Sequence, residues 1–193
     1  SLPVKTLKEF IAFAKAQPGR VNYGTSGTGS VAHLSTEYLK SLARIDIVHV
    51  PYKGGGPALV DLISGQVQMT FSGVPQILPH LKAGRVKIIA IGHPTRIRSL
   101  PDTPPVADVL PGFNNTSWYG LLAPVGTPQA IVNRINATMN QVLVNPDFGQ
   151  RLLLQGVEPV TSTPQGMRDM IANELARWRK VIKDAGISVE SAQ

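Results

Sequence analysis

Residues 21–34 read VNYGTSGTGSVAHL, which combines a short apolar run, a loop of glycines and hydroxyl residues, and the beginning of an amphipathic segment. Val31, Leu34, Tyr38 and Leu42 recur at helical spacing after the loop and predict one face of a helix. Glycine clusters between periodic segments mark turns. The stretch therefore predicts a strand, a tight loop and a helix in succession.

The same succession is repeated along the first half of the chain. Further strands are predicted from β-branched or apolar runs at residues 45–50, 67–71 and 86–91. Helices are expected before and between the strands: residues 7–14 after a capping box at Thr6, a helix with Pro57 as its first residue, and residues 77–82.

Alternation of strands and helices sets the expected fold class. Parallel strands need crossover connections, so residues 1–92 are predicted to form an α/β unit with a mostly parallel sheet flanked by helices. Open sheets of this kind bind ligands at the edge where the carboxyl ends of their strands meet. Three loops of small residues are expected to converge there: 24–29, 52–56 and 72–75.

The second half of the chain has a different texture. Residues 94–112 are rich in proline and indicate an ordered connector, so a domain boundary is expected nearby. Residues 118–123 predict another strand, and residues 131–142, 151–154 and 164–185 predict helices.

Composition excludes several classes of protein. The chain of 193 residues is 42% hydrophobic and 16% charged, which is typical of a globular protein, and it has no cysteine for disulfide or thiol chemistry. No apolar run reaches the length of about 18 residues that a membrane-spanning helix needs. The net charge of +7 favours an anionic partner. Because the cations are scattered singly, nucleic acid is not the expected partner.

Two nucleotide-binding motifs are nearly matched and neither is supported. Residues 27–32 fit G-x-G-x-x-A, but the second strand ends at Tyr52-Lys53, where a dinucleotide site needs an acid for the ribose. Residues 24–29 approach a phosphate loop, but Ser30 stands where the lysine is required. No cofactor is therefore expected.

Catalytic and metal motifs are also missing. Ser26 fails the G-x-S-x-G nucleophile motif by one position, and the four histidines show no metal-ligand spacing; His49 is interpreted as an ordinary strand residue. No catalytic residue and no metal site are predicted. A hydrolase that uses Ser26 and a basic nucleic-acid-binding module remain as alternative hypotheses.

The glycine-rich loop indicates an anion site. It carries the hydroxyls of Thr25, Ser26, Thr28 and Ser30, its Gly27 and Gly29 let backbone N–H groups approach a ligand, and the helix that follows points its positive end at the same place. Without a lysine in the loop, a carboxylate fits better than a polyphosphate, and Lys53 could supply the countercharge. The same spacing is also typical of a tight turn with a serine cap.

Several short motifs are distributed over almost the whole chain: NYGTSG (22–27), HVPYKG (49–54), PAL (57–59), LPDTP (100–104), PGF (111–113), SWYGLLAP (117–124), GTP (126–128) and GVEPV (156–160). Together they resemble the solute receptors of tripartite tricarboxylate transporters, the Bug or TctC proteins. The resemblance implies a periplasmic, non-catalytic binding protein of the type II periplasmic-binding-protein class. Such a protein closes two α/β lobes on a small carboxylate and passes it to membrane permease subunits.

The resemblance also assigns the parts of the chain. Residues 1–115 would form the second ligand-binding lobe, and residues 116–193 the hinge strand and the C-terminal helices of the first lobe. The ligand, a di- or tricarboxylate, an amino acid or an aromatic acid, would contact residues 25–30 with Tyr52, Lys53, Ser72 and the hinge residue Trp118. Ser72 follows Phe71 where many relatives carry Asp or Asn, so one polar ligand contact would differ.

The resemblance further implies about a hundred residues before Ser1, comparable to one small domain, so the chain is expected to be a fragment. Its C-terminal helices would then lack the sheet that they normally cover. We expect their apolar residues to be exposed and the fragment to self-associate or to leave the helices mobile; these residues include Ile131, Ile135, Leu152, Met170 and Ile171.

Overall fold

Two short parallel strands organise the N-terminal part of the protein in the computed structural model, which describes residues 2–187. β1 (Asn22–Thr25) pairs with β2 (Val48–Pro51), with Tyr23 opposite His49. This parallel arrangement is the one that alternating strands and helices predict.

The expected third strand lies beside β1 on the side opposite β2. Met69 forms a parallel bridge with Tyr23, the Gly24 N–H donates to the Met69 carbonyl at 2.9 Å, and the Gln68 N–H donates to the Asn22 carbonyl at 2.8 Å. The segment therefore runs parallel to β1 as predicted, although only one residue pair completes the ladder.

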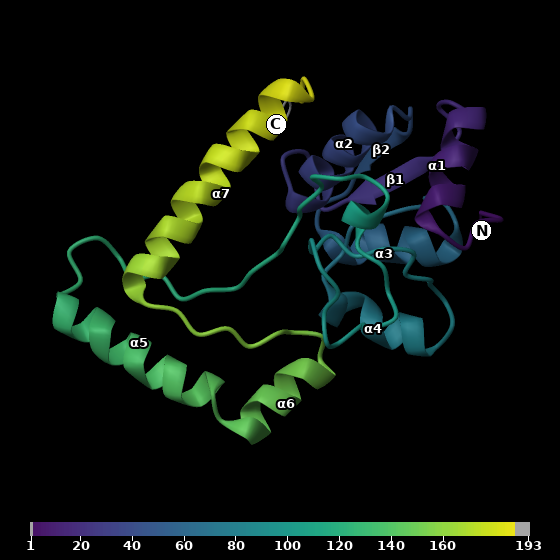
Figure 1. The fold of residues 1–193 in the computed structure, drawn as a ribbon. Helices are drawn as coiled ribbons and strands as arrows, with labels where there is room; N and C mark the ends of the chain where they lie inside the picture. Colours follow the sequence, from purple (N-terminus) through teal and green to yellow (C-terminus); the bar gives the residue numbers. More distant parts are fainter. Residues whose placement is uncertain (1, 188–193) are drawn as a thin grey trace.

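Helices make up nearly half of the described chain, and those of its N-terminal half surround the strands (Figure 1). In chain order they are α1 (Leu7–Ala16), α2 (Val31–Ala43), α3 (Gly55–Ser64), α4 (Val74–Lys82), the 3-10 turn η1 (Val106–Asp108), α5 (Gln129–Leu143), α6 (Pro146–Leu154) and α7 (Pro164–Asp184).

Capping residues explain where several helices begin. Thr6 Oγ1 accepts the Glu9 N–H at 3.2 Å at the start of α1, and Glu9 in turn accepts the Lys5 N–H at 2.6 Å. Ser30 Oγ accepts the His33 N–H at 3.3 Å at the start of α2, and Thr163 Oγ1 accepts the Gly166 N–H at 2.9 Å at the start of α7. These side chains satisfy N–H groups that the helix itself leaves unpaired. The predicted cap at Thr6 is confirmed, while Glu9 reaches the N–H of Lys5 and not that of Thr6, as a strict capping box would require.

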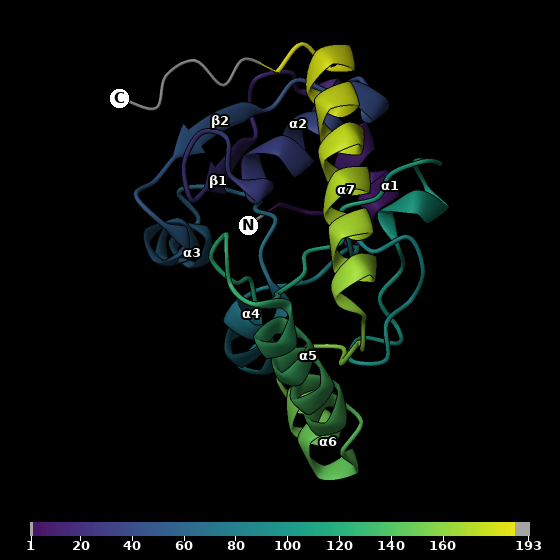
Figure 2. The same ribbon diagram turned by 90° about the vertical axis from the view of Figure 1, so that its left-hand side faces the viewer.

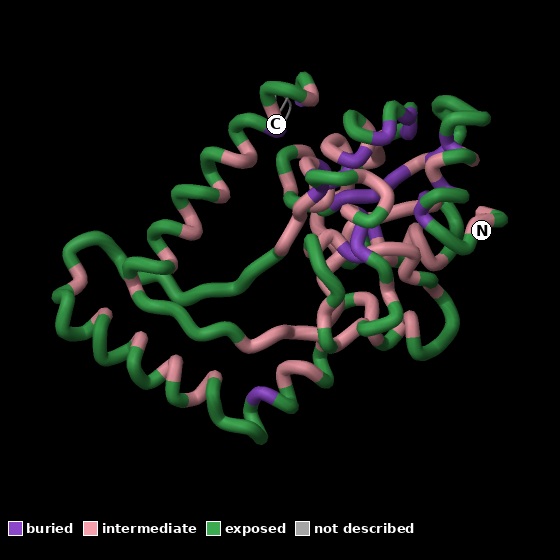
Figure 3. The backbone as a smooth tube through the Cα atoms, in the orientation of Figure 1, coloured by how far each residue is buried: buried purple, intermediate pink, exposed green. Residues whose placement is uncertain are grey.

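One hydrophobic core holds the N-terminal part together. Its buried members come from α1, the strands, α2 and the connector, and include Leu7, Phe10, Val21, Tyr23, Leu39, Ile47, Val106 and Phe113. The Tyr38 and Phe71 rings stack on Phe113, with centroids 5.1 and 5.9 Å away. Figure 3 shows the buried residues gathered in this body, which we define as residues 2–116.

The buried face of α2 differs from the predicted one. The described burial falls on His33, Ser35, Thr36, Leu39 and Ala43, whereas Val31 and Leu42 of the predicted face are exposed. Ser35 and Thr36 can be buried because their hydroxyls donate to the carbonyls of Val31 and Ala32 within the helix. Small polar residues thus form part of the buried face of α2, and a prediction from hydropathy alone selects the wrong face of this helix.

Three further predictions need correction. α3 begins at Gly55, so Pro57 is its third residue. The predicted fourth strand, residues 86–91, forms only a bridge between Ile91 and Pro105, and the hinge segment 118–123 joins no ladder within residues 2–187. A strand needs a hydrogen-bonded neighbour along its length, and the described chain provides none for these two segments.

The C-terminal part, which we call the arm (residues 117–187), leaves the body and carries α5, α6 and α7. In Figures 1 and 2, α5 and α6 project away from the strands, while the C-terminal end of α7 returns to lie beside α2. Large apolar side chains on the arm face solvent, among them Tyr119, Leu121, Leu122, Ile131, Ile135 and Leu175. The exposure predicted for Ile131 and Ile135 is confirmed; Leu152, Met170 and Ile171 are half-buried.

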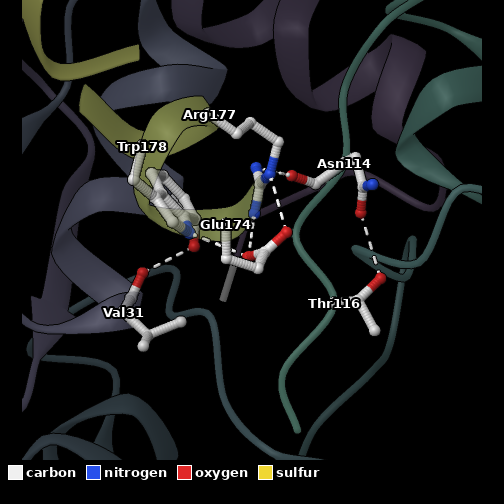
Figure 4. Close-up of polar contacts among 7 residues, drawn as sticks. Val31, Asn114, Thr116, Glu174, Arg177 and Trp178 are labelled. Carbon is white, nitrogen blue, oxygen red and sulfur yellow. Dashed lines mark hydrogen bonds and ion pairs between the residues drawn. The ribbon is translucent and has the colours of Figure 1, made fainter. Parts of the chain in front are cut away.

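A cluster of polar contacts fastens α7 to the body (Figure 4). Arg177 donates to the Asn114 carbonyl at 2.6 Å and pairs with Glu174, which also accepts from the Trp178 indole at 3.2 Å. The Arg177 guanidinium lies 4.4 Å from the Trp178 ring centroid. The helix is thereby held at the point where the connector becomes the arm.

Among the described residues, no helix is both long and apolar enough to cross a lipid bilayer.

Candidate functional site

Three loops meet at the carboxyl edge of the parallel segments, as the alternation predicts. The Tyr52 N–H donates to the Thr25 carbonyl at 3.0 Å, which joins the first loop to the second. The second loop meets the third at Gly55, where an added Cβ would lie 3.6 Å from Gln76 Oε1. Ser72 Oγ is 3.0 Å from the same Gln76 oxygen. The three sequence segments are therefore neighbours in space.

Each loop runs into a helix whose N-terminus points to this edge. α2, α3 and α4 carry no acidic residue in their first turns, and α3 and α4 begin at Gly54 and Gly73 without a side-chain cap. The unpaired N–H groups of a first turn carry the positive end of the helix dipole. Three such ends at one edge create a positive field, and none of the three first turns carries a carboxylate to offset it.

Hydrogen bonds donated by its own backbone N–H groups hold the glycine-rich loop in shape. The Gly27 N–H donates to Thr25 Oγ1 at 3.2 Å, the Gly29 N–H to His33 Nδ1 at 3.1 Å, and the Ser30 N–H to the Gly27 carbonyl at 3.2 Å. The loop needs glycine because φ is +125° at Gly27 and +79° at Gly29. The N–H groups of Gly27 and Gly29, which we expected to face a ligand, are therefore already hydrogen-bonded to side chains of the protein.

Other groups of the loop remain available to a ligand. Thr25 is buried, and Ser30 is the N-cap of α2, which is the capping role that the spacing also allowed. The exposed Ser26 and the half-buried Thr28 make no hydrogen bond through hydroxyl or amide within the part of the chain described. The outward donors of this loop are thus Ser26, Thr28 and the first turn of α2.

Two histidines lie directly beneath the loop. His33 comes from α2 and His49 from β2, and their rings stack with centroids 4.2 Å apart. His49 Nε2 is 2.7 Å from Thr25 Oγ1, while His33 Nδ1 accepts the Gly29 N–H. Each histidine therefore holds one end of the loop, which is more than the strand position we assigned to His49.

The environment keeps both imidazoles neutral. Burial, together with the neighbouring His33, lowers the pKa of His49 to about 4. Burial also lowers the pKa of His33. A neutral ring is what the Gly29 N–H requires, because a protonated Nδ1 cannot accept a hydrogen bond.

A series of stacked and hydrogen-bonded side chains extends from His49 through Tyr23 to Glu37 and Lys40. The Tyr23 ring stacks on His49 at 5.0 Å, and its hydroxyl donates to Glu37, which also pairs with Lys40 at 2.7 Å. Burial, together with the Glu37 hydrogen bond, raises the pKa of Tyr23 far above its ordinary value. Tyr23 is therefore a hydrogen-bond donor to Glu37 at any ordinary pH.

The second loop contributes two candidate residues with different roles. The Tyr52 hydroxyl donates to Asp61 at 2.6 Å, which raises the pKa of Tyr52 and turns the side chain toward α3. Lys53 is exposed at the site edge. Of this pair, Tyr52 orders the loop through Asp61, and Lys53 is the one whose side chain is exposed.

The hinge segment reaches the site through Tyr119. An added Cβ on Gly73 would lie 3.6 Å from the Tyr119 hydroxyl, so this side chain stands at the start of α4 near the candidate residue Ser72. The candidate Trp118 is 40% exposed, and its ring packs beside Gly120.

Sequence reasoning missed four residues of the site: His33, His49, Gln76 and Tyr119. His33 stands three residues before Thr36 and six before Leu39, so a buried face drawn through those two residues would have included it. The other three carry no sequence signal, because their place depends on how separate elements pack.

A hollow of about 360 Å³ lies away from the three loops, between α5 and α6, and is lined by Thr138, Gln141, Val142, Asn145 and Phe148.

In residues 2–187, no cluster of three or more histidine, aspartate or glutamate side chains could hold a metal ion. The exposed Ser26 is not hydrogen-bonded to the buried His33 or to the half-buried His49, since these are engaged by Gly29 and Thr25. This arrangement gives the hydrolase hypothesis no general base.

Comparison with known proteins agrees with the fold. The family model described as "Tripartite tricarboxylate transporter family receptor" (TctC) matches residues 1–187. BugT from Bordetella pertussis is 34% identical over 190 residues, which are 98% of this chain and 58% of BugT. The chain therefore spans little more than half the length of this relative.

Solved structures show the same fold. Rpa4515 of R. palustris with adipate matches with a TM-score of 0.92 and 38% identity over 97% of this chain and 63% of that one. MatC (Rpa3494) of Rhodopseudomonas palustris with bound malate matches with a TM-score of 0.82 and 33% identity over 93% and 63%. The body is thus a periplasmic-binding-protein-like α/β unit with a parallel sheet and flanking helices. With a family model that covers nearly all of it, the chain belongs to the TctC family of tripartite tricarboxylate transporter receptors.

Proposed function

We propose that the protein is the periplasmic solute-binding receptor of a tripartite tricarboxylate transporter, and that it captures a small carboxylate without chemical change. The observation that carries this proposal is the convergence of three acid-free helix N-termini at one edge of the sheet. Helix N-termini stabilise anions, and hydroxyl and amide donors can bind a carboxylate without a fixed countercharge.

The ligand's carboxylate would lie over the first turns of α2 and α3. Ser26 and Thr28 would donate from the first loop and Lys53 would add charge from the second, while Gly27, Gly29, Thr25, Ser30 and Tyr52 keep the loops in shape. Ser72 and Tyr119 would meet the distal end of the ligand. The solved relatives with adipate and malate support a dicarboxylate as the first class to test.

In this proposal, residues 1–115 are the second lobe, and residues 116–193 form the hinge and helices of the first lobe; residues 1 and 188–193 lie outside the described range. The exposed apolar faces of the arm support this division, because helices that pack on a sheet carry such faces. The exposed loop edge also needs a second wall to enclose a ligand. Delivery to membrane permease subunits in the periplasm follows from the receptor family.

A thermal-shift screen tests the proposal on the full chain with dicarboxylates, tricarboxylates, amino acids and aromatic acids. Adipate or malate at a hundred times its dissociation constant should stabilise the folded state by about 2.7 kcal/mol and raise Tm by several degrees. If no compound of the panel raises Tm, the proposed ligand class is wrong.

Matched lysine variants test the site. Lys53→Met should weaken binding of the active compound several-fold by removing a nearby positive charge. Lys82→Met removes an equally exposed charge at the C-terminal end of α4 and should leave the affinity unchanged. Equal effects of the two variants would argue that only the net charge of the protein attracts the ligand.

A further inference from the structure

We propose that His33 and His49 act as positioning residues that hold the glycine-rich loop in its binding shape, and that the contact made by His33 exists only while its imidazole is neutral. This inference rests on the proposed function and adds a pH-sensitive step to it. The two rings stack beneath the loop at a centroid distance of 4.2 Å, and each contacts one end of residues 25–29. Protonation of the pair would release the loop and lower the affinity for a carboxylate.

His33 controls the end of the loop that leads into α2. Its Nδ1 accepts the Gly29 N–H at 3.1 Å, so the neutral ring carries its proton on Nε2. A second proton would have to sit on Nδ1, where it would face the Gly29 N–H and remove the acceptor. The bond and the imidazolium form of His33 are therefore mutually exclusive.

His49 controls the end of the loop that leaves β1. Its Nε2 lies 2.7 Å from Thr25 Oγ1, and the same hydroxyl accepts the Gly27 N–H at 3.2 Å. The backbone between these two anchors includes Gly27 at a φ of +125° and Gly29 at +79°. Such a loop holds one shape only where its surroundings fix it.

Among the charged groups around the pair, Glu37 favours the imidazolium form, but burial outweighs its effect on both rings. Glu37 on α2 already accepts from Tyr23 and pairs with Lys40, whose charge opposes a second cation. On the other neighbouring elements, Lys53 follows β2, while α7 presents Glu174 and Arg177, which pair with each other. A charge on one stacked ring also opposes a charge on the other. The surroundings thus favour two neutral rings.

The sign of the pH effect follows from these pKa values. Both imidazoles have a pKa below the ordinary 6.5 in the folded chain, and that of His49 is about 4. The opened loop therefore binds more protons than the closed loop at intermediate pH. The closed loop is fully favoured above about pH 6.5 and is lost as the pH falls toward 4.

Hydrogen exchange of the Gly29 amide in the full chain tests the loop directly and needs no ligand. After correction for intrinsic rates, wild-type protection should be high at pH 7.5 and fall at least tenfold by pH 5. His33→Asn places an acceptor near the Nδ1 position that does not titrate, so it should keep protection at both pH values. His33→Leu should lose the protection of the Gly29 amide at both pH values. His80→Asn on α4 is the matched control.

Two results would overturn the inference. One is Gly29 protection in His33→Leu equal to that in the wild type, and the other is wild-type protection that does not change between pH 7.5 and 5. Circular dichroism confirms that each variant is folded. If His33→Leu does not fold, the comparison between the wild type and His33→Asn still decides the question.

Titration calorimetry with adipate, or with whichever carboxylate raises Tm, tests the link to binding. Wild-type affinity should fall about tenfold more than that of His33→Asn between pH 7.5 and 5, since ligand protonation is common to both proteins. Parallel pH dependence in the two proteins would refute the role of His33 in binding and leave the receptor function intact. Failure of every carboxylate to bind the wild type would instead refute the proposed function, with loop anchoring decided by exchange.

Discussion

The body and the arm of this protein bury their apolar residues to very different extents. In the body, Leu7, Phe10, Tyr23, Leu39 and Phe113 are at most 5% exposed and pack in one cluster. In the arm, the buried residues are Gly149, Val181 and Ile187, while Tyr119, Leu122 and Val125 are more than 70% exposed.

The difference indicates that the body buries its apolar residues by itself, whereas the apolar residues of the arm need another surface to cover them. A cluster that closes on itself can stabilise the body without a partner. Helices with exposed apolar residues require another surface, because contiguous apolar patches on monomers are usually small. The first three predictions below compare a change in the body with one in the arm, and the last compares two positions within the body.

The largest effect expected is association of the 193-residue chain through the arm. Dissociation in the micromolar range would correspond to about 8 kcal/mol. Light scattering should give at least a dimer, and Ile131→Lys with Ile135→Lys should restore the monomer. Val60→Lys, an exposed position on α3, is the control in the body. A strictly monomeric wild type with strong hydrogen-exchange protection across residues 131–183 would show that the arm is complete by itself.

A truncated side chain should reduce the unfolding free energy far more in the core of the body than on the arm. Phe10→Ala removes a ring that is 2% exposed and should cost about 3–5 kcal/mol of unfolding free energy. Ile135→Ala, at a position 46% exposed, should cost less than about 1 kcal/mol. Urea unfolding measures both. Similar losses would mean that the arm contributes to one common core.

The contact between the two regions should depend on Arg177. Arg177→Met removes a charged hydrogen bond to the Asn114 carbonyl, worth about 1.5–3 kcal/mol, and should raise hydrogen exchange along α7. Arg98→Met breaks an ion pair with Glu158 in which the arginine is 68% exposed, and should cost less than about 1 kcal/mol. Unchanged exchange in α7 after Arg177→Met would assign the docking of this helix to its apolar contacts.

The smallest stability effect, with a clear effect on binding, is expected in the glycine-rich loop. Gly27→Val places a β-branched residue at a φ of +125° and should reduce carboxylate affinity at least tenfold, or about 1.4 kcal/mol, by reshaping the loop. Gly84→Val introduces a similar backbone conflict at +68° after α4, far from the loop. Binding that survives Gly27→Val as well as it survives Gly84→Val would make the loop a purely structural turn.

The parts of the protein that depend on local interactions could be predicted from the amino-acid sequence. Capping at Thr6, the stop at Gly65, the glycine-rich loop and the long helix ending at Asp184 follow from side chains that act within a few residues of one another. The convergence of three loops follows from alternation, because parallel strands place their carboxyl ends at one edge.

Tertiary structure alone decided which residues meet across the fold. Small hydroxyl residues bury one face of α2 because their side chains bond back to the helix, a choice that hydropathy does not reveal. Segments 86–91 and 118–123 have strand-like sequences but find no continuous partner in residues 2–187. His33 and His49 became a pair because α2 packs over β2, and a contact between elements is not written in the spacing within either one.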